Sequence, residues 1–280
     1  MYAMVMKPLN IILGSSGKTG SRIVKKLNQL DIPIRLGSRK SNPSFDWEKT
    51  ESWETLIKGV DHIYISYQLD LAVPTSIHHI QTLVDLAIKC KVKRLVLLSG
   101  RGEPEAITCE KLVQGSGLEW TILRSSWFFQ NFSEGMFLDA ILQRKIIFPK
   151  IKIKEPFIDL DDLTDLTVDS LVNQKHVGKL YELTGPTLYS FEETFRFIAN
   201  EIKESIPFEE IPLQDYISML GDFGLSKETI WLIQYLFETV LDGRNEFIRN
   251  DFETAMGRKP KDFKYYVKEP AKSGVWNSKF

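Results

Sequence analysis

The stretch LNIILGSSGKTGSRIVKKLNQL, residues 9–30, decides the fold. Its apolar run Ile11–Leu13 contains two β-branched residues and is typical of a buried strand. Glycines follow, and apolar residues then recur at helical spacing through Leu30. Strand, glycine turn and helix in this order predict a dinucleotide-binding βα unit. Glycines let the backbone approach a pyrophosphate closely, and the free N–H groups at a helix N-terminus attract its negative charge. The alternative is a plain βα turn. The predicted cofactor loop consists of Gly14, Ser15, Ser16, Gly17, Lys18, Thr19 and Gly20.

Composition excludes several classes of protein. The 280 residues are 43% hydrophobic and carry 36 basic and 37 acidic side chains, and no basic stripe suggests a nucleic-acid groove. Cys90 and Cys109 offer neither a disulfide framework nor metal spacing, which fits a reducing cytoplasm. No apolar stretch is long enough to span a bilayer, and the N-terminus lacks a signal peptide. We therefore expect a cytoplasmic protein with no nucleic-acid, membrane or metal partner.

Strands and helices alternate at βαβ spacing up to about residue 125. This pattern predicts an α/β fold, a Rossmann-type doubly wound parallel sheet, in which Phe45–Trp47 forms a short strand. We expect residues 1–125 to form the NAD(P)-binding core and residues 126–280 a smaller, mostly helical, substrate-covering part. The strand at 180–183 is expected to return to the sheet. Residues 207–257 are predicted as helices, and residues 261–280 as a loose tail.

Cofactor choice is predicted at the end of the second strand. NAD enzymes place a carboxylate there for the ribose 2′-hydroxyl, but this chain has Ser38, Arg39 and Lys40. A guanidinium can hold a 2′-phosphate through two N–H donors. The sequence thus favours NADPH over NADH, with Ser38 and Arg39 at the phosphate and Lys40 in support. A solvated basic turn is the alternative.

The proton donor of ordinary short-chain dehydrogenases is missing. None of the nine tyrosines has a lysine four residues later, whereas a serine, Ser99, ends the central strand. This absence argues against ordinary alcohol–ketone chemistry.

At this point the chain resembles a known family. The glycine loop, the LLS strand end at Ser99 and LEWTIL ahead of Arg124 are similar to the NmrA-like atypical short-chain dehydrogenases. Further blocks are similar to the festuclavine and agroclavine dehydrogenases of ergot-alkaloid biosynthesis and their bacterial relatives. They are FDW at 45–47, GVDHIYIS at 59–66, RLVLLS at 94–99, RSSWFFQNFSE at 124–134, PFIDLDDL at 156–163, YELTGP at 181–186 and GVW at 274–276. Ser125 departs from the proline usual in the family.

The resemblance implies roles for individual residues. Tyr64, Ser66 and Tyr67 would border the adenosine half of the cofactor, and Asp46 would approach the adenine. Ser99 and Glu110 would lie near the nicotinamide as catalytic candidates. Trp127, Phe128, Phe129 and Asn131 would cover the nicotinamide and shape the substrate site. Each also has a plainer interpretation, since aromatic side chains often pack in a core and a helical glutamate often faces solvent.

The family resemblance further implies an activity. Its dehydrogenases use NADPH to reduce an iminium formed from an amine and an aldehyde. We therefore expect an NADPH-dependent oxidoreductase acting on an iminium, or a similarly activated double bond, of a small organic substrate. The alternatives are an NADPH-dependent quinone or azo reductase, and a non-catalytic dinucleotide sensor that signals to a protein partner.

Overall fold

A six-stranded sheet organises the first part of the chain in the computed structural model, which describes residues 7–277. From edge to edge the strands are β2 (Ile34–Gly37), β1 (Asn10–Leu13), β3 (His62–Ile65), β4 (Arg94–Gly100), β5 (Glu119–Ser125) and β7 (Lys179–Leu183). The first five strands pair in parallel, with Ile12 opposite Tyr64 and Leu97 opposite Ile122. The carboxyl ends of these strands therefore meet at one edge, where doubly wound folds bind ligands.

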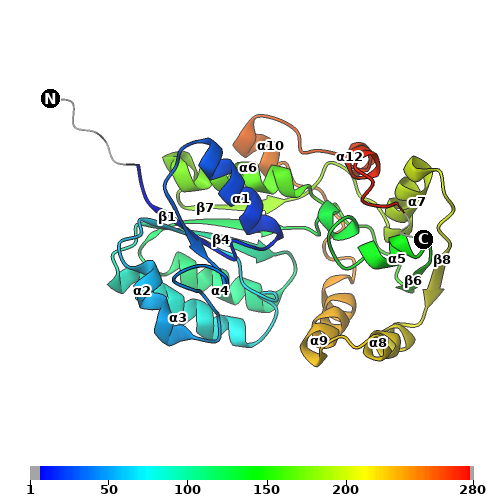
Figure 1. The fold of residues 1–280 in the computed structure, drawn as a ribbon, viewed down its shortest axis with the longest axis horizontal. Helices are drawn as coiled ribbons and strands as arrows, with labels where there is room; N and C mark the ends of the chain where they lie inside the picture. The colour runs from blue at the N-terminus through cyan, green and yellow to red at the C-terminus, as the bar shows by residue number, and fades with distance from the viewer. Residues whose placement is uncertain (1–6, 278–280) are drawn as a thin grey trace. The chain divides into compact units, whose positions relative to one another are not determined.

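Helices cover both faces of this sheet (Figure 1). On one side lie α1 (Lys18–Gln29) and α6 (Leu160–Val172), which are joined by an ion pair between Lys26 and Asp165. On the other side lie α2 (Trp53–Ile57), α3 (Thr75–Lys89) and α4 (Pro104–Gln114). The central strands are apolar and buried, as two-sided coverage requires. The predicted α/β, Rossmann-type class is confirmed.

The chain divides into two compact units. Unit 1 contains residues 1–125 and 163–182, and unit 2 contains residues 126–162 and 183–280. The domain limits proposed from the sequence remain a prediction.

The predicted strand at Phe45–Trp47 is wrong, because Phe45 and Asp46 have no regular secondary structure and Trp47 begins a turn. The Asp46 carbonyl accepts a hydrogen bond from Trp53 Nε1 at 2.7 Å, and the Asp46 carboxylate accepts one from the Glu48 N–H at 3.2 Å. The rings of Phe45 and Trp47 pack against Trp53 in the core. Local hydrogen bonds and ring burial thus replace the ladder of a strand.

Unit 2 has its own small sheet and an aromatic core. The strands β6 (Ile146–Pro149) and β8 (Phe208–Ile211) pair in parallel. Its helices are α5 (Leu138–Leu142), α7 (Phe191–Ile202), α8 (Leu213–Asp222), α9 (Lys227–Tyr235), α10 (Asp251–Met256), α11 (Phe263–Tyr266) and α12 (Lys268–Lys272). Helix α7 begins with a capping box in which Ser190 Oγ accepts from the Glu193 N–H at 3.1 Å. The all-helical prediction for residues 207–257 is wrong at β8, since that segment forms a strand beside β6.

The predicted loose tail is also wrong for the described residues 261–277. Phe263 and Trp276 are fully buried, and Trp276 Nε1 donates to the Phe132 carbonyl at 2.7 Å. The tail is held by contacts with residues far away in the sequence, which local patterns do not reveal. Residues 278–280 lie outside the described part.

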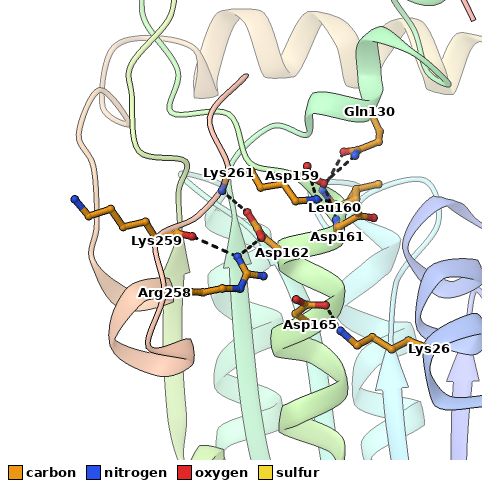
Figure 2. Close-up of polar contacts among 10 residues, drawn as sticks. All are labelled: Lys26, Gln130, Asp159, Leu160, Asp161, Asp162, Asp165, Arg258, Lys259 and Lys261. Atoms are coloured by element: carbon orange, nitrogen blue, oxygen red, sulfur yellow. Dashed lines mark hydrogen bonds and ion pairs between the residues drawn. The ribbon is translucent and has the colours of Figure 1, made fainter. Parts of the chain in front are cut away.

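A buried carboxylate anchors this C-terminal segment (Figure 2). Asp162 is fully buried, and its carboxylate accepts from Arg258 Nη1 at 2.6 Å and from the Lys261 N–H at 2.6 Å. Beside it Asp159 caps the start of α6, accepting from the Asp161 N–H at 2.7 Å. The acidic residues thus have a structural explanation. Burial raises the pKa of Asp162 in spite of Arg258, as expected when desolvation exceeds the attraction.

Arg258→Ala is expected to lower the free energy of unfolding by about 1–3 kcal/mol at neutral pH, because Asp162 then stays buried without its cation. Asp162 already has a raised pKa, so its folded state takes up a proton more readily than its unfolded state. The loss should therefore shrink at acid pH, where a protonated Asp162 needs no cation. Urea unfolding at two pH values checks this, and an equal loss at both would contradict the role of Asp162.

Two properties of residues 7–277 bear on function. None of their helices is long and apolar enough to cross a bilayer. They also contain no group of three or more His, Cys, Asp or Glu side chains arranged to hold a metal ion.

Candidate active site

The glycine loop between β1 and α1 has the backbone that the sequence predicted. Gly14 has a φ of +76°, a conformation that side chains disfavour. The N–H groups of Gly14 and Ser15 donate to the Gly37 carbonyl at 2.8 and 3.1 Å, which ties the loop to the end of β2. The predicted pyrophosphate loop and the predicted phosphate-selecting turn are therefore neighbours.

The helix α1 packs closely on this loop. A Cβ on Gly20 would lie 2.2 Å from the Gly14 carbonyl oxygen, so no side chain fits there. Gly17 is the N-cap of α1, is exposed, and has no side-chain cap. Close helix packing and an uncapped helix N-terminus are what a bound pyrophosphate requires. The loop residues fit the predicted cofactor.

The turn after β2 presents two cations. Ser38 is buried, and its Oγ accepts a hydrogen bond from the Lys40 N–H at 3.3 Å, which fixes the turn. Arg39 and Lys40 are exposed, and within residues 7–277 neither side chain has a hydrogen bond or an ion pair. Their positive charges remain available to an anionic ligand.

Below the loop, Tyr64 projects from β3 toward α1. Its side chain is fully buried, and its hydroxyl lies beside Thr19 and Ser66 without a well-directed hydrogen bond. Burial raises the pKa of Tyr64 above its ordinary value. A buried polar atom without a partner is costly, so a ligand group at the loop could stabilise it.

Two other predicted cofactor residues have different partners. The Tyr67 hydroxyl lies 2.7 Å from His79 Nδ1, and its ring lies 4.6 Å from that of Trp47. Burial raises the pKa of Tyr67. Asp46 holds the turn described above. Tyr67 therefore belongs to the aromatic core and Asp46 to the turn beside it, and the contact of both residues with adenosine remains a prediction.

Ser99 and Glu110 lie together in a buried polar network. Ser99 Oγ donates to Glu110 Oε1 at 2.6 Å, and both side chains are almost fully buried. Arg124 donates to the same carboxylate through Nε at 2.9 Å and Nη2 at 2.5 Å, and its Nη1 donates to Glu182 at 2.9 Å. Glu110 raises the pKa of Arg124 further. We call Ser99, Glu110, Arg124 and Glu182 the edge network.

The edge network limits what these groups can do. Both oxygens of Glu110 already accept hydrogen bonds, from Ser99 and from Arg124, so neither oxygen is left for a ligand. The Ser99 proton points to Glu110, which leaves the lone pairs of Ser99 Oγ to accept a hydrogen bond. One arginine and two glutamates give the network a net charge of −1. This edge therefore suits a cationic group better than a developing oxyanion.

The sequence identified only part of this site. It named Ser99 and Glu110, whose catalytic roles remain predictions, but it assigned no role to Glu182, Asp70 or Glu103. The signal for Glu182 was its place in β7, because parallel strands bring their carboxyl ends together.

The predicted substrate residues all lie in unit 2. Trp127 is half-buried and packs edge-on against Phe191 at 5.5 Å, and Phe129 is buried against Phe263 at 5.1 Å. Phe128 is half-buried and forms no ring contact within residues 7–277. The Asn131 carbonyl accepts from the Phe137 N–H at 3.1 Å. Trp127 and Phe129 thus contribute to the core, whereas Phe128 keeps a ring available. Substrate contact remains a prediction for all four.

Curated relatives match almost the whole chain, although no family model matches it. The chain is 27% identical to prestalk A differentiation protein A of Dictyostelium discoideum, covering 92% of this chain and 91% of that one. It is 26% identical to agroclavine dehydrogenase of Claviceps fusiformis, covering 95% and 98%. It is 23% identical to an uncharacterised oxidoreductase of Bacillus subtilis, covering 96% of each.

Solved structures share the fold. A nucleoside-diphosphate-sugar epimerase of Staphylococcus aureus matches with a TM-score of 0.80 at 18% identity, over 94% of this chain and 100% of that one. An NADPH-dependent quinone oxidoreductase of Escherichia coli, solved with NADPH, matches with a TM-score of 0.78 at 16% identity, over 93% and 99%. The relatives include clavine dehydrogenases and the fold is that of NAD(P)-binding reductases and epimerases, so the resemblance to the agroclavine and festuclavine dehydrogenase branch of the NmrA-like atypical short-chain dehydrogenases is confirmed.

Proposed function

We propose that the protein is an NADPH-dependent oxidoreductase that delivers hydride to an iminium, or a similarly activated double bond, of a small organic substrate. Similarity to agroclavine dehydrogenase over nearly all of both chains supports this activity. The free thiols of Cys90 and Cys109 support the cytoplasm as its compartment.

Residues of unit 1 have the properties needed to hold NADPH, which supplies hydride when bound. The loop Gly14–Gly20 would receive the pyrophosphate, because its glycines leave backbone N–H groups accessible. Arg39 would hold the 2′-phosphate, with Ser38 fixing the turn and Lys40 adding charge. Ser99 would lie near the nicotinamide and accept a hydrogen bond from the substrate rather than from the cofactor.

One observation carries the choice of substrate: the Ser99 hydroxyl donates to Glu110, so it can only accept from a ligand. An iminium carries positive charge that hydride neutralises, and its nitrogen needs no proton in that step. The lone pairs of Ser99 and the net charge of −1 in the edge network both stabilise such a cation. A ketone instead needs a donor for its developing oxyanion.

NADPH oxidation against panels of preformed iminium ions, quinones and aldehydes tests the proposal. We expect turnover of iminium ions, with NADPH preferred to NADH. Tight NADPH binding without turnover of any panel would instead support a redox sensor with a protein partner. A sensor is retained as the alternative because one relative is named as a differentiation protein. Turnover of quinones alone would favour the quinone or azo reductase.

Ser99→Ala is expected to lower kcat/KM for an iminium by about 10-fold, the contribution of one hydrogen bond of roughly 1–1.5 kcal/mol. The affinity for NADPH should stay the same. Steady-state kinetics and a cofactor titration measure the two effects separately. Wild-type kinetics in the variant would remove Ser99 from the substrate site.

A further inference from the structure

A second polar feature lies at the carboxyl end of β4, one residue beyond Ser99. Gly102 has a φ of +78°, and the turn at this glycine carries Glu103 back over the strand end. A Cβ on Gly100 would lie only 2.1 Å from Glu103 Oε1 and 2.3 Å from its Oε2. The Glu103 carboxyl thus occupies the place that a side chain of Gly100 would take.

This carboxyl has no ordinary structural role. Glu103 is the N-cap of α4, yet its side chain makes no capping hydrogen bond. It is only 5% exposed, and its Oε2 is buried without a hydrogen-bond partner. In the described part of the chain no cation pairs with Glu103 or with Asp70. The Glu103 carboxyl therefore has one oxygen available to a ligand at this edge of the sheet.

The neighbour of Glu103 is a second carboxyl, that of Asp70 in the loop after β3. The Asp70 carboxyl is close enough for its charge to act on Glu103, and Asp70 Oδ1 accepts from the Ala72 N–H at 2.9 Å. Ionised carboxylates only accept hydrogen bonds, so a bond between two carboxyls requires a proton on one of them. Glu103 Oε2 is buried without a donor, and no cation pairs with this carboxyl in the described residues, so a proton on the Asp70–Glu103 pair would replace the missing partner.

The surroundings keep that proton bound. Burial raises the pKa of Glu103 well above its ordinary value, and the charges of Asp70, Glu105 and Glu110 raise it further. Burial also raises the pKa of Asp70, which its bond to the Ala72 N–H offsets only in part. A carboxylic acid whose pKa is raised by burial is the kind of group that acts as a general acid.

We infer that the Asp70–Glu103 pair donates a proton to substrates of the quinone and activated-carbonyl class, for which no tyrosine donor is present. The inference rests on the proposed NADPH-dependent function. Hydride forms a new bond at the acceptor, the electron pair of the C=O bond moves to oxygen, and the pair protonates that oxygen. Solvent then returns one proton to the pair. The overall reaction converts NADPH, a proton and a carbonyl compound into NADP⁺ and an alcohol. For a quinone the product is the hydroquinone.

Glu103→Gln tests the inference, since the amide keeps the size and can still donate a hydrogen bond to Asp70. We expect kcat/KM for a quinone to fall by about 10²-fold, the usual effect of one general acid. Turnover of a preformed iminium and the affinity for NADPH should each change less than about 3-fold, because iminium reduction needs no proton. Glu51→Gln makes the same change at an exposed glutamate away from the pair, and this control should behave as wild type. Equal losses on both substrates, or no loss on either, would overturn the inference.

Gly100→Ala gives the same test without removing the carboxyl. Its Cβ must displace the flexible end of Glu103, so it should reproduce the selective loss on quinones. A folded Gly100→Ala protein that reduces quinones at the wild-type rate would count against the pair.

The bound proton can be observed without any turnover. Infrared difference spectra at neutral pH should show the carbonyl stretch of a protonated carboxylic acid, which Glu103→Gln removes. The pKa of Glu103 is raised in the folded state, so the free energy of unfolding of the wild type should fall as the pH rises above the ordinary glutamate range. The Glu103→Gln variant should lack this dependence on pH. Absence of both signals would overturn the inference and would say nothing against NADPH binding.

The turnover experiments separate the inference from the proposed function. A wild-type protein that reduces iminium ions but no quinones would overturn the inference and leave the proposed function standing. Failure on both substrate classes would refute the proposed function as well.

Discussion

Arg94→Met is expected to lower the free energy of unfolding by about 3–5 kcal/mol, the usual cost of breaking a buried ionic contact on one side. Arg94 lies on β4 and is only 1% exposed. Its Nη1 donates to the carbonyls of Ser170, Leu171 and Asn173 at 3.0, 3.3 and 3.1 Å. Its Nε and Nη2 donate to Glu119 at 2.9 and 2.8 Å. The variant leaves the carbonyls at the end of α6 without donors.

Lys93→Met is the matched control for Arg94→Met. Lys93 is the preceding residue, is 67% exposed, and pairs with Asp61 at 2.8 Å. Such a surface pair contributes roughly 0–1 kcal/mol. Urea unfolding of both variants measures the difference. Similar small losses in the two would show that the contacts of Arg94 with the end of α6 do not stabilise unit 1.

Arg39→Glu is expected to weaken NADPH binding by about 2–4 kcal/mol, or roughly 30- to 1,000-fold, because it removes a charge-assisted pair and adds repulsion. NADH lacks the 2′-phosphate, so its affinity should change little. Calorimetric titration with both cofactors measures the selectivity. Lys49→Glu makes the same change of charge farther along the same connection, just before α2, and serves as the control. Equal losses for NADPH and NADH would remove Arg39 from the phosphate site.

The sequence predicts the core of the fold because its signals there are local. The run Ile11–Leu13, the glycines and the amphipathic helix lie within one stretch and agree with one another. The same holds for the capping box at Ser190, which needs only residues three apart.

The predictions fail where distant contacts decide the structure. Phe45–Trp47 looks like a strand, but the ring of Trp53 and the Asp46 turn give these residues better packing and hydrogen bonds. The segment after residue 260 looks loose, because the carbonyl that binds Trp276 belongs to Phe132.

The candidate site shows the same division. The backbone of the glycine loop can be predicted, since glycine spacing carries the information, and its contact with the cofactor remains a prediction. The Asp70–Glu103 pair cannot, because its two residues are far apart in the sequence and only the folded sheet edge brings them together. Its one sequence signal is the pair of glycines around Arg101, which permits Glu103 to fold back.

Transfer of deuterium from NADPH labelled at C4 to a preformed cyclic iminium tests the central claim most directly. NADPH binding is followed in the same sample by fluorescence, and the product amine is analysed by mass spectrometry. For one of the two C4 epimers, the account predicts one deuterium at the former iminium carbon. Bound NADPH with no deuterated amine from either epimer would contradict it.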